Sequence, residues 1–265
     1  MKFRIYFREL EQSMSNMDVP DTVDFHCHLD LCQDMRAAYA RCESARCLTL
    51  AVTTTPKAFA RNESMAQDGR FVRAALGIHP QLVAQRASEL SLFEELAPST
   101  RFIGEVGLDA GRRFYSSFER QKLVFERVMQ LCARLGDKVI SIHSVRTAKQ
   151  VLDVVEQAGT HRSCVPVLHW FSASRPEIRR ALDLGCYFSV NEQMITAPTG
   201  QKLLDTVPLS RVLTETDAPF QSGEFGGKFP GDVSGAIRLI ARAYGMDQSA
   251  TAARIRRTAM ELLTV

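Results

Sequence analysis

The chain has 265 residues, of which 45% are hydrophobic and 24% charged, which are the proportions of an ordinary globular protein. The length fits one large domain or two small ones. A net charge of +3 permits a phosphate-bearing partner such as a nucleic acid without requiring one. No apolar run approaches the roughly 18 residues of a membrane span, so no membrane partner is expected.

Seven cysteines are present and none forms a CxxC pair. This pattern favours free thiols in a reducing, cytoplasmic environment over a cysteine metal site or a disulfide framework. The first residues form a basic segment whose apolar run is too short for a signal peptide. We therefore expect residues 1–21 to be an N-terminal extension, and residues 22–265 to form the folded domain.

Short apolar, β-branched runs recur along the chain and predict eight strands, at 23–28, 47–54, 71–79, 102–109, 138–143, 165–170, 186–190 and 212–217. Between most of them the spacing is helical, most clearly at 88–97, 117–135 and 248–263. Eight strands alternating with helices predict an α/β fold, a single TIM-like (β/α)8 barrel of about 250 residues. A doubly wound open sheet is the alternative, but no glycine-rich nucleotide loop follows the first predicted strand.

In such a barrel the functional residues lie at the C-terminal ends of the strands, where the strand-to-helix loops form the site. The chain has six histidines, and five of them close a predicted strand: His26, His28, His79, His143 and His169. Because side chains at i and i+2 of a strand point to the same face, His26 and His28 should both enter the barrel mouth.

Two carboxylates, Glu105 and Asp217, lie in equally apolar predicted strands. An unpaired carboxylate in a protein core costs several kcal/mol, so a positive group must lie beside each of them. A divalent metal is the simplest answer, because imidazoles and carboxylates are ligands of zinc, manganese or nickel. The alternative is that these inward polar groups only satisfy one another.

Six segments then occur in a fixed order: HCH, GIHP, GEVGLD, SIHS, LHWFS and TETDAP. Together they resemble the TatD family of metal-dependent hydrolases, which are amidohydrolase-like TIM barrels, and the likeness covers almost all of 22–265. The wording VDFHCHLDL, AVTTTP, ALGIHPQL, PVLHWFS and LTETDAPF is similar to the TatD-type component of Qat anti-phage defence systems. This narrower resemblance implies a role in defence, with other Qat-system proteins as partners.

The resemblance implies two divalent metal ions, as Zn, Mg or Mn, held by His26, His28, Glu105, His143, His169 and Asp217. The first two histidines and the aspartate would bind one ion, the glutamate would bridge, and the other two histidines would bind the second ion. Family members cleave DNA, often as 3′→5′ exonucleases, and a few resemble deacylases of D-aminoacyl-tRNA. Two ions about 3.5–4 Å apart can activate a water and stabilise both oxygens of a phosphoryl displacement.

We expect Glu105, Asp217 and His79 to be catalytic. Glu105 would set the separation of the ions, and Asp217 would hold or accept the proton of the attacking water. Two roles are open for His79: donation to a non-bridging phosphate oxygen, or orientation of a metal ligand.

Substrate contacts are predicted at His79, Asp109, Arg146 and Trp170. Asp109 either contacts substrate or orients a ligand. Arg146 is displaced by one residue from the Ser-Arg pair that the family often has after its strand-five histidine. Trp170 either stacks a base or packs in the wall. The sequence has no long basic stripe, so single-stranded or terminal DNA is the expected partner rather than a tightly bound duplex.

Three functions follow from these observations. The first is a two-metal DNase, and the second is a metal-dependent amide or ester hydrolase acting on a modified nucleotide or D-aminoacyl-tRNA. The third is a mainly structural subunit of a defence complex. Glu105 occupies the place where amide-cleaving relatives commonly carry a modified lysine, which favours the first. The glycine-rich segment 220–231 departs from the family pattern and is a candidate lid.

Overall fold

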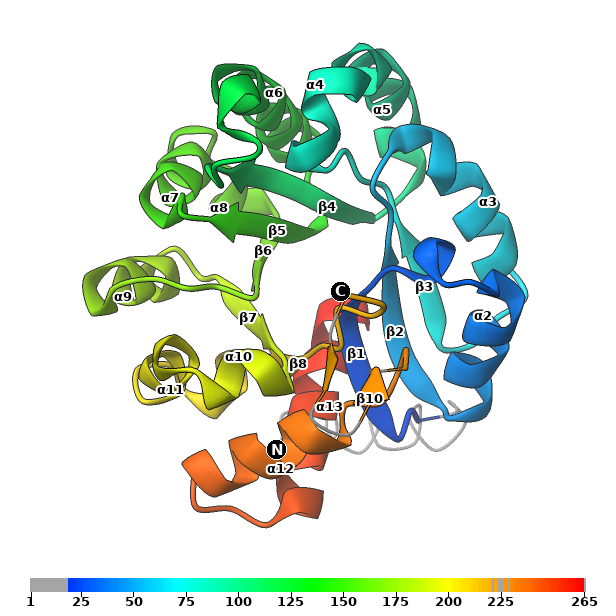
Figure 1. The fold of residues 1–265 in the computed structure, drawn as a ribbon, viewed down its shortest axis with the longest axis vertical. Coiled ribbons are helices and arrows are strands. Elements are labelled where there is room, and N and C mark those ends of the chain that lie inside the picture. Colours follow the sequence, from blue (N-terminus) through cyan, green and yellow to red (C-terminus); the bar gives the residue numbers. More distant parts are fainter. Residues whose placement is uncertain (1–18, 221, 224–225, 228, 265) are drawn as a thin grey trace, which may run out of the picture.

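Eight strands form a ring at the centre of the molecule, and helices surround it (Figure 1). This computed structural model describes residues 19–220, 222–223, 226–227 and 229–264. The predicted (β/α)8 barrel is confirmed, since consecutive strands pair in parallel within each of two sheets that together form the ring, and each strand is followed by at least one helix. The first strand begins at Thr22, and residues 1–18 of the expected extension lie outside the described residues.

The barrel strands are β1 (Thr22–Cys27), β2 (Cys47–Val52), β3 (Val72–Ala75), β4 (Phe102–Asp109), β5 (Val139–Val145), β6 (Val165–His169), β7 (Tyr187–Val190) and β8 (Val212–Thr214). The helices are α2 (Met35–Ser44), α3 (Pro56–Ala66), α4 (Val83–Arg86), α5 (Leu90–Leu96), α6 (Phe118–Leu135), α7 (Ala148–Gln157), α8 (Thr160–Ser163), α9 (Arg175–Asp183), α10 (Glu192–Thr196), α11 (Pro198–Leu204), α12 (Ser234–Ala243) and α13 (Gln248–Thr264). Within the candidate lid, β9 (Ser222–Gly223) pairs antiparallel with β10 (Gly226–Gly227), and residues 221, 224–225 and 228 lie outside the described residues.

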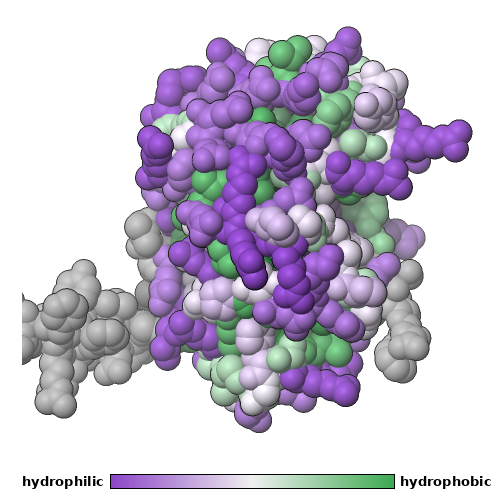
Figure 2. Space-filling model, turned by 90° about the vertical axis from the view of Figure 1, so that its left-hand side faces the viewer, coloured by the Kyte–Doolittle hydropathy of each residue, from purple (hydrophilic) through white to green (hydrophobic). Residues whose placement is uncertain are grey.

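The core lies between the ring of strands and the helices. Helix α6 shows how it forms, because Val124, Phe125, Val128 and Cys132 recur at three- and four-residue steps and are all buried on one face. Each fully buried apolar side chain of this kind contributes about 1.5–3 kcal/mol. The outer face over α7, α9 and α11 is mostly hydrophilic, with small scattered apolar areas (Figure 2). In the part of the chain that the structure describes, no helix is both long and apolar enough to cross a membrane.

The ring consists of two hydrogen-bonded sheets, β1-β2-β3 and β4-β5-β6-β7-β8, which meet at two seams. At the β3–β4 seam the Leu76 N–H donates to Phe102 O, and the Gly104 N–H donates to Leu76 O. At the β8–β1 seam the Asp217 N–H donates to His26 O. Candidate site residues therefore take part in closing the barrel.

Two strands, β3 and β8, end at least three residues before their predicted limits. The run 71–79 is a strand only to Ala75, because the following residues divide their hydrogen bonds between two neighbours: the Ile78 N–H donates to Glu105 O and the His79 N–H to Thr54 O. His79 therefore caps the 3-10 helix Pro80–Leu82 and does not close a strand. The run 212–217 is a strand only to Thr214, because the chain turns through a left-handed residue at position 217.

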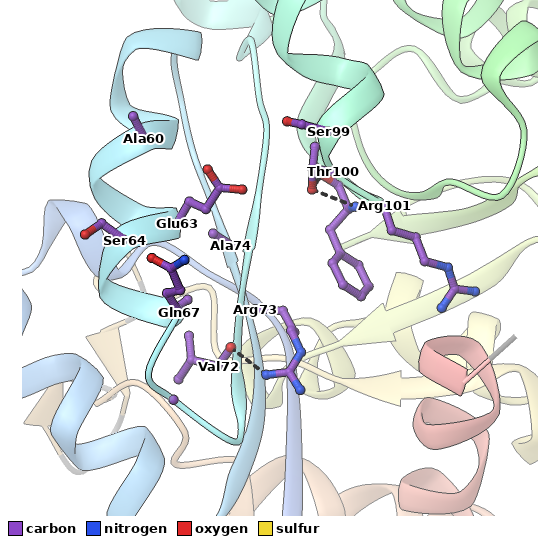
Figure 3. A pocket seen from close by; sticks show the side chains of 13 residues that line it. Ala60, Glu63, Ser64, Gln67, Val72, Arg73, Ala74, Ser99, Thr100 and Arg101 are labelled. Carbon is purple, nitrogen blue, oxygen red and sulfur yellow. Dashed lines mark hydrogen bonds between the residues drawn. The ribbon is translucent and has the colours of Figure 1, made fainter.

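A cavity of about 560 Å³ lies at the N-terminal end of the β3–β4 seam, between α3, β3 and residues 99–102. Figure 3 shows Arg73 and Arg101 on one side of it and Glu63 and Gln67 of α3 on the other. The Arg73 guanidinium donates to Val72 O. Since the sites of barrel enzymes lie at the opposite, C-terminal face, this cavity is a gap in the seam and not the candidate site.

Candidate metal centre

The six predicted metal ligands come together at the C-terminal end of the barrel. They lie on or just beyond β1, β4, β5, β6 and β8, and none is more than 8% exposed. Three overlapping groups of donor atoms, each within 4.8 Å of one another, include all six of these residues together with His79. Side chains from five strands therefore share one buried polar cluster.

The donors of His26, His28, Glu105 and Asp217, called the first group below, have the spacing of a single coordination sphere. His26 Nε2 and His28 Nε2 lie 3.4 Å apart, and they are 3.4 and 3.2 Å from Glu105 Oε2. The same two nitrogens are 3.8 and 3.6 Å from Asp217 Oδ1. Donors at roughly 2.0–2.2 Å from a tetrahedral ion are themselves about 3.3–3.6 Å apart. The donor set and its spacing therefore fit a divalent cation.

A second group of donors shares Glu105. Its other oxygen, Oε1, lies 2.6 Å from His143 Nδ1 and 3.8 Å from His169 Nε2. The two oxygens of one buried carboxylate thus face two different groups of imidazoles. A cation at the second group would displace the His143 Nδ1 proton, because metal-binding imidazoles are deprotonated at the ligating nitrogen.

His26 and His169 are each oriented by a contact at Nδ1, the ring nitrogen opposite the one that faces Glu105. His26 Nδ1 bonds to Ser141 Oγ at 2.7 Å, and the His169 Nδ1–H donates to Glu215 Oε2 at 2.9 Å. Such contacts fix the ring and leave the other nitrogen free for a metal. His28 differs, because its buried Nδ1 has no hydrogen-bond partner among the described residues.

Glu215 is the site residue that the sequence analysis missed. It is 1% exposed and also accepts hydrogen bonds from Ser189 Oγ and Asn191 Nδ2. Its signal was present, because it lies inside the TETDAP segment as a second carboxylate in an apolar run. Without the structure, its partner on β6 could not be identified.

The charges of the cluster push its two acids in opposite directions. Burial acts to raise the pKa of Glu105, but His79, His26 and His143 outweigh it and hold the pKa well below its usual range. Burial raises the pKa of Asp217 to about 7, against the opposing effect of His169. Glu105 is therefore ionised in this environment, while the raised pKa of Asp217 lets its carboxyl both accept and release a proton near neutral pH.

The histidines divide in the same way. Burial lowers the pKa of His26 and of His79, which keeps both rings in the neutral form that binds a metal. Burial also acts to lower the pKa of His143 and His169, but neighbouring carboxylates raise them to about 9 and about 10. Without a cation, the protonated rings of His143 and His169 therefore supply the positive charge that offsets the carboxylates of the cluster.

His79 and Asp109 both belong to the cluster. His79 Nε2 lies 3.1 Å from Glu105 Oε2, while its Nδ1 accepts the Gln81 N–H at 3.1 Å. Asp109 Oδ2 lies 3.1 Å from His143 Nε2 and accepts the Gln81 side-chain amide at 2.8 Å. Asp109 thus contacts the ring of a candidate ligand, on the nitrogen opposite Glu105.

Arg146 and Trp170 lie at the mouth. They line a cavity of about 380 Å³ together with Ser172 and the cluster residues His143, His169 and Asp217. Arg146, Trp170 and Asp217 all have left-handed backbones, with φ of 58°, 41° and 52°. Such conformations are unfavourable for residues with side chains and concentrate at functional sites.

Comparison with known proteins gives a consistent result. A family model described as TatD related DNase matches residues 23–264. The Escherichia coli protein YjjV, described as an uncharacterized metal-dependent hydrolase, is 31% identical over 210 residues, which cover 74% of this chain and 79% of YjjV. The 3′-5′ ssDNA/RNA exonuclease TatD of Edwardsiella piscicida is 33% identical over 157 residues, covering 57% and 59% of the two chains. The crystal structure of YjjV superimposes with a TM-score of 0.81 at 24% identity, covering 93% of this chain and 99% of that one.

Proposed function

The chain belongs to the family of TatD-related DNases, and from this premise we propose that it cleaves DNA phosphodiester bonds with two divalent metal ions at the cluster around Glu105. We further propose a 3′→5′ exonuclease acting on single-stranded or terminal DNA. The observation that carries the two-metal proposal is that Glu105 Oε2 lies near His26 and His28 while its Oε1 lies near His143 and His169. The similarity to a named 3′-5′ exonuclease supports the polarity.

The residues present fit the ions. His26, His28 and Asp217 would hold one ion, His143 and His169 would hold the other, and Glu105 would contact both. When bound, the ions would lower the pKa of a water and stabilise negative charge on the phosphate oxygens.

The protein's own residues would do the remaining work. Asp217 lines the cavity and is placed to accept the proton of the attacking water. His79 Nε2, beside Glu105, could donate to a non-bridging phosphate oxygen when that atom enters the cluster. Arg146 lines the same cavity with a guanidinium that makes no ion pair with any described residue, so its charge is available to the substrate backbone. Trp170 offers a ring at the same mouth.

The biological setting is a further part of the proposal. The segments that resemble the TatD-type component of Qat systems support a cytoplasmic role in anti-phage defence, alongside other Qat-system proteins. In that setting the substrate would be an invading or damaged DNA end. Deletion of the gene from its host and challenge with phage would test the role, with loss of protection as the expected result.

The enzymatic proposal is tested with end-labelled single-stranded DNA and added Mg²⁺, Mn²⁺ or Zn²⁺. We expect metal-dependent shortening from the 3′ end that Glu105→Gln abolishes. Glu94→Gln is the matched control, because Glu94 is a partly exposed surface residue paired with Arg127. Shortening that survives Glu105→Gln would refute the mechanism. Two bound metals with intact DNA would direct the next assay to D-aminoacyl-tRNA.

A further inference from the structure

Phe220 is an exposed aromatic residue at the edge of the metal centre. Phe220 follows Asp217 by three residues in the chain, and it is 62% exposed. Its ring centroid lies 5.2 Å from that of His28, with the two planes at 81°. This ring is therefore accessible to a ligand that binds at the candidate metal centre.

The backbone of Phe220 is held by residues of the candidate metal centre. The Phe220 N–H donates to Asp217 O at 2.9 Å, and the Asp217 N–H donates to His26 O at 2.9 Å. On the other side the His28 N–H donates to Ala218 O at 2.8 Å. The backbone that carries the ring is therefore held in place relative to the candidate ligands, and the ring itself contacts His28, which lowers the cost of using it for binding.

A row of rings connects Phe220 to Trp170 across the cluster. His28 and His26 are in edge contact with centroids 5.1 Å apart, and His26 stacks on His169 at 3.6 Å. Trp170 meets His169 edge-on at 6.4 Å. An aromatic side chain thus lies at each end of the histidine row, with Glu105 and Asp217 facing the row between them.

We propose that Phe220 is a specificity-determining residue on which an unpaired base next to the scissile phosphate stacks. This inference rests on the proposed nuclease function. A phosphate held over the cluster has the Trp170 ring on one side and the Phe220 ring on the other. A base can cover the Phe220 ring only if it has left its neighbours, so the ring favours single-stranded or frayed ends over paired ones. The contact is tolerant of sequence, because every base has a π-face.

The test uses variants that change the ring without disturbing the fold. Phe220→Leu keeps an apolar side chain but removes the ring, and Phe220→Trp restores one. Leu123→Ala on α6 is the control for loss of exposed apolar surface, because Leu123 is 68% exposed. Equal metal content and equal melting temperature would show that the variants are intact.

Two readouts are measured on single-stranded oligonucleotides. Loss of one base stack corresponds to roughly a 5- to 150-fold weaker interaction. We expect Phe220→Leu to raise KM within that range with little change in kcat, and Phe220→Trp and Leu123→Ala to keep a low KM. The second readout is binding without cleavage, with Ca²⁺ in place of the active metal. The fluorescence of a 2-aminopurine base near the 3′ end should be quenched on binding to wild type and to Phe220→Trp but not to Phe220→Leu.

The outcomes separate this inference from the nuclease proposal. If wild type shortens DNA but Phe220→Leu keeps the wild-type KM and quenching, the stacking role is wrong and the nuclease proposal stands. If wild type neither binds nor shortens DNA, the nuclease proposal fails, and the stacking role fails with it. A Phe220→Leu variant that loses kcat and metal while KM is unchanged would instead make Phe220 a structural support for His28.

Discussion

Replacement of Glu215 by glutamine tests whether the contacts behind the candidate ligands control metal binding. Glu215 Oε2 accepts the His169 Nδ1–H and the Ser189 hydroxyl, and Oε1 accepts the Asn191 side-chain amide. The Asn191 side-chain amide cannot turn over to present its oxygen to residue 215, because that oxygen accepts the Met194 N–H and this hydrogen bond would be lost. A glutamine has only one oxygen, so in either orientation its NH₂ group faces a donor.

The expected losses of metal affinity and of folding stability follow from these contacts. If the NH₂ faces His169, the ring must move its proton to Nε2, which is the nitrogen nearest Glu105, and this blocks coordination. Loss of such an orienting carboxylate costs about 10- to 100-fold in metal affinity, or about 1.4–2.8 kcal/mol. A buried donor left without an acceptor costs about 1–3 kcal/mol of folding stability in addition.

The assay is competition for Zn²⁺ against a chromophoric chelator, combined with thermal unfolding of chelator-treated protein. Ser189→Ala is the matched control, because it removes one hydrogen bond but keeps the carboxylate and its bond to His169. We expect Glu215→Gln to weaken binding of one zinc equivalent, and Ser189→Ala to change it much less. Unchanged zinc affinity in Glu215→Gln, in a folded protein, would refute the reasoning.

Four further substitutions test the folding stability of the barrel around the site. Asp24→Asn should lower the free energy of unfolding by about 1–3 kcal/mol in urea titrations, because the buried carboxylate accepts three hydrogen bonds that an amide cannot all accept; an unchanged midpoint would contradict this. Lys138→Met should cost a similar amount, since its ammonium donates to two backbone carbonyls at the N-terminal end of the barrel, yet zinc affinity should not change. Gly77→Ala should yield little folded protein, because its Cβ would lie 2.5 Å from the Glu105 nitrogen. Gly159→Ala, with φ of 69° and no atom within 4 Å of the new Cβ, should lose only about 1–2 kcal/mol.

The sequence was sufficient for the number and order of the barrel strands, because buried β-branched runs alternate with amphipathic helices. It was not sufficient for the ends of β3 and β8. An apolar run reports which residues are buried, but it does not report where their backbone hydrogen bonds go. The Ile78 N–H donates to Glu105 O on β4 and the His79 N–H to Thr54 O just beyond β2, and the left-handed backbone of Asp217 follows the early end of the last strand.

The convergence of the candidate ligands was predictable for a related reason. Parallel strands end on one face, so donors placed at strand ends must meet there once the barrel is accepted. The contacts behind them were not predictable, because the bond between His169 and Glu215 joins residues 46 positions apart and depends on strand register. The contact between Phe220, the first residue of the candidate lid, and His28 was not predictable either, because it joins residues far apart in the sequence.

The candidate metal ligands and the closure of the barrel use the same segments in this protein. The β8–β1 seam depends on backbone bonds made by His26 and Asp217, and on the Asp24 carboxylate, which holds the turn at Thr216. A cation held by the side chains of His26 and Asp217 would therefore also stabilise the seam, so that its binding would add to the free energy of unfolding. Removal of metal should consequently increase amide exchange first at the β8–β1 seam, while β5, which is paired on both edges, stays protected. Uniform loss of protection around the ring would show that the site and the seam are independent.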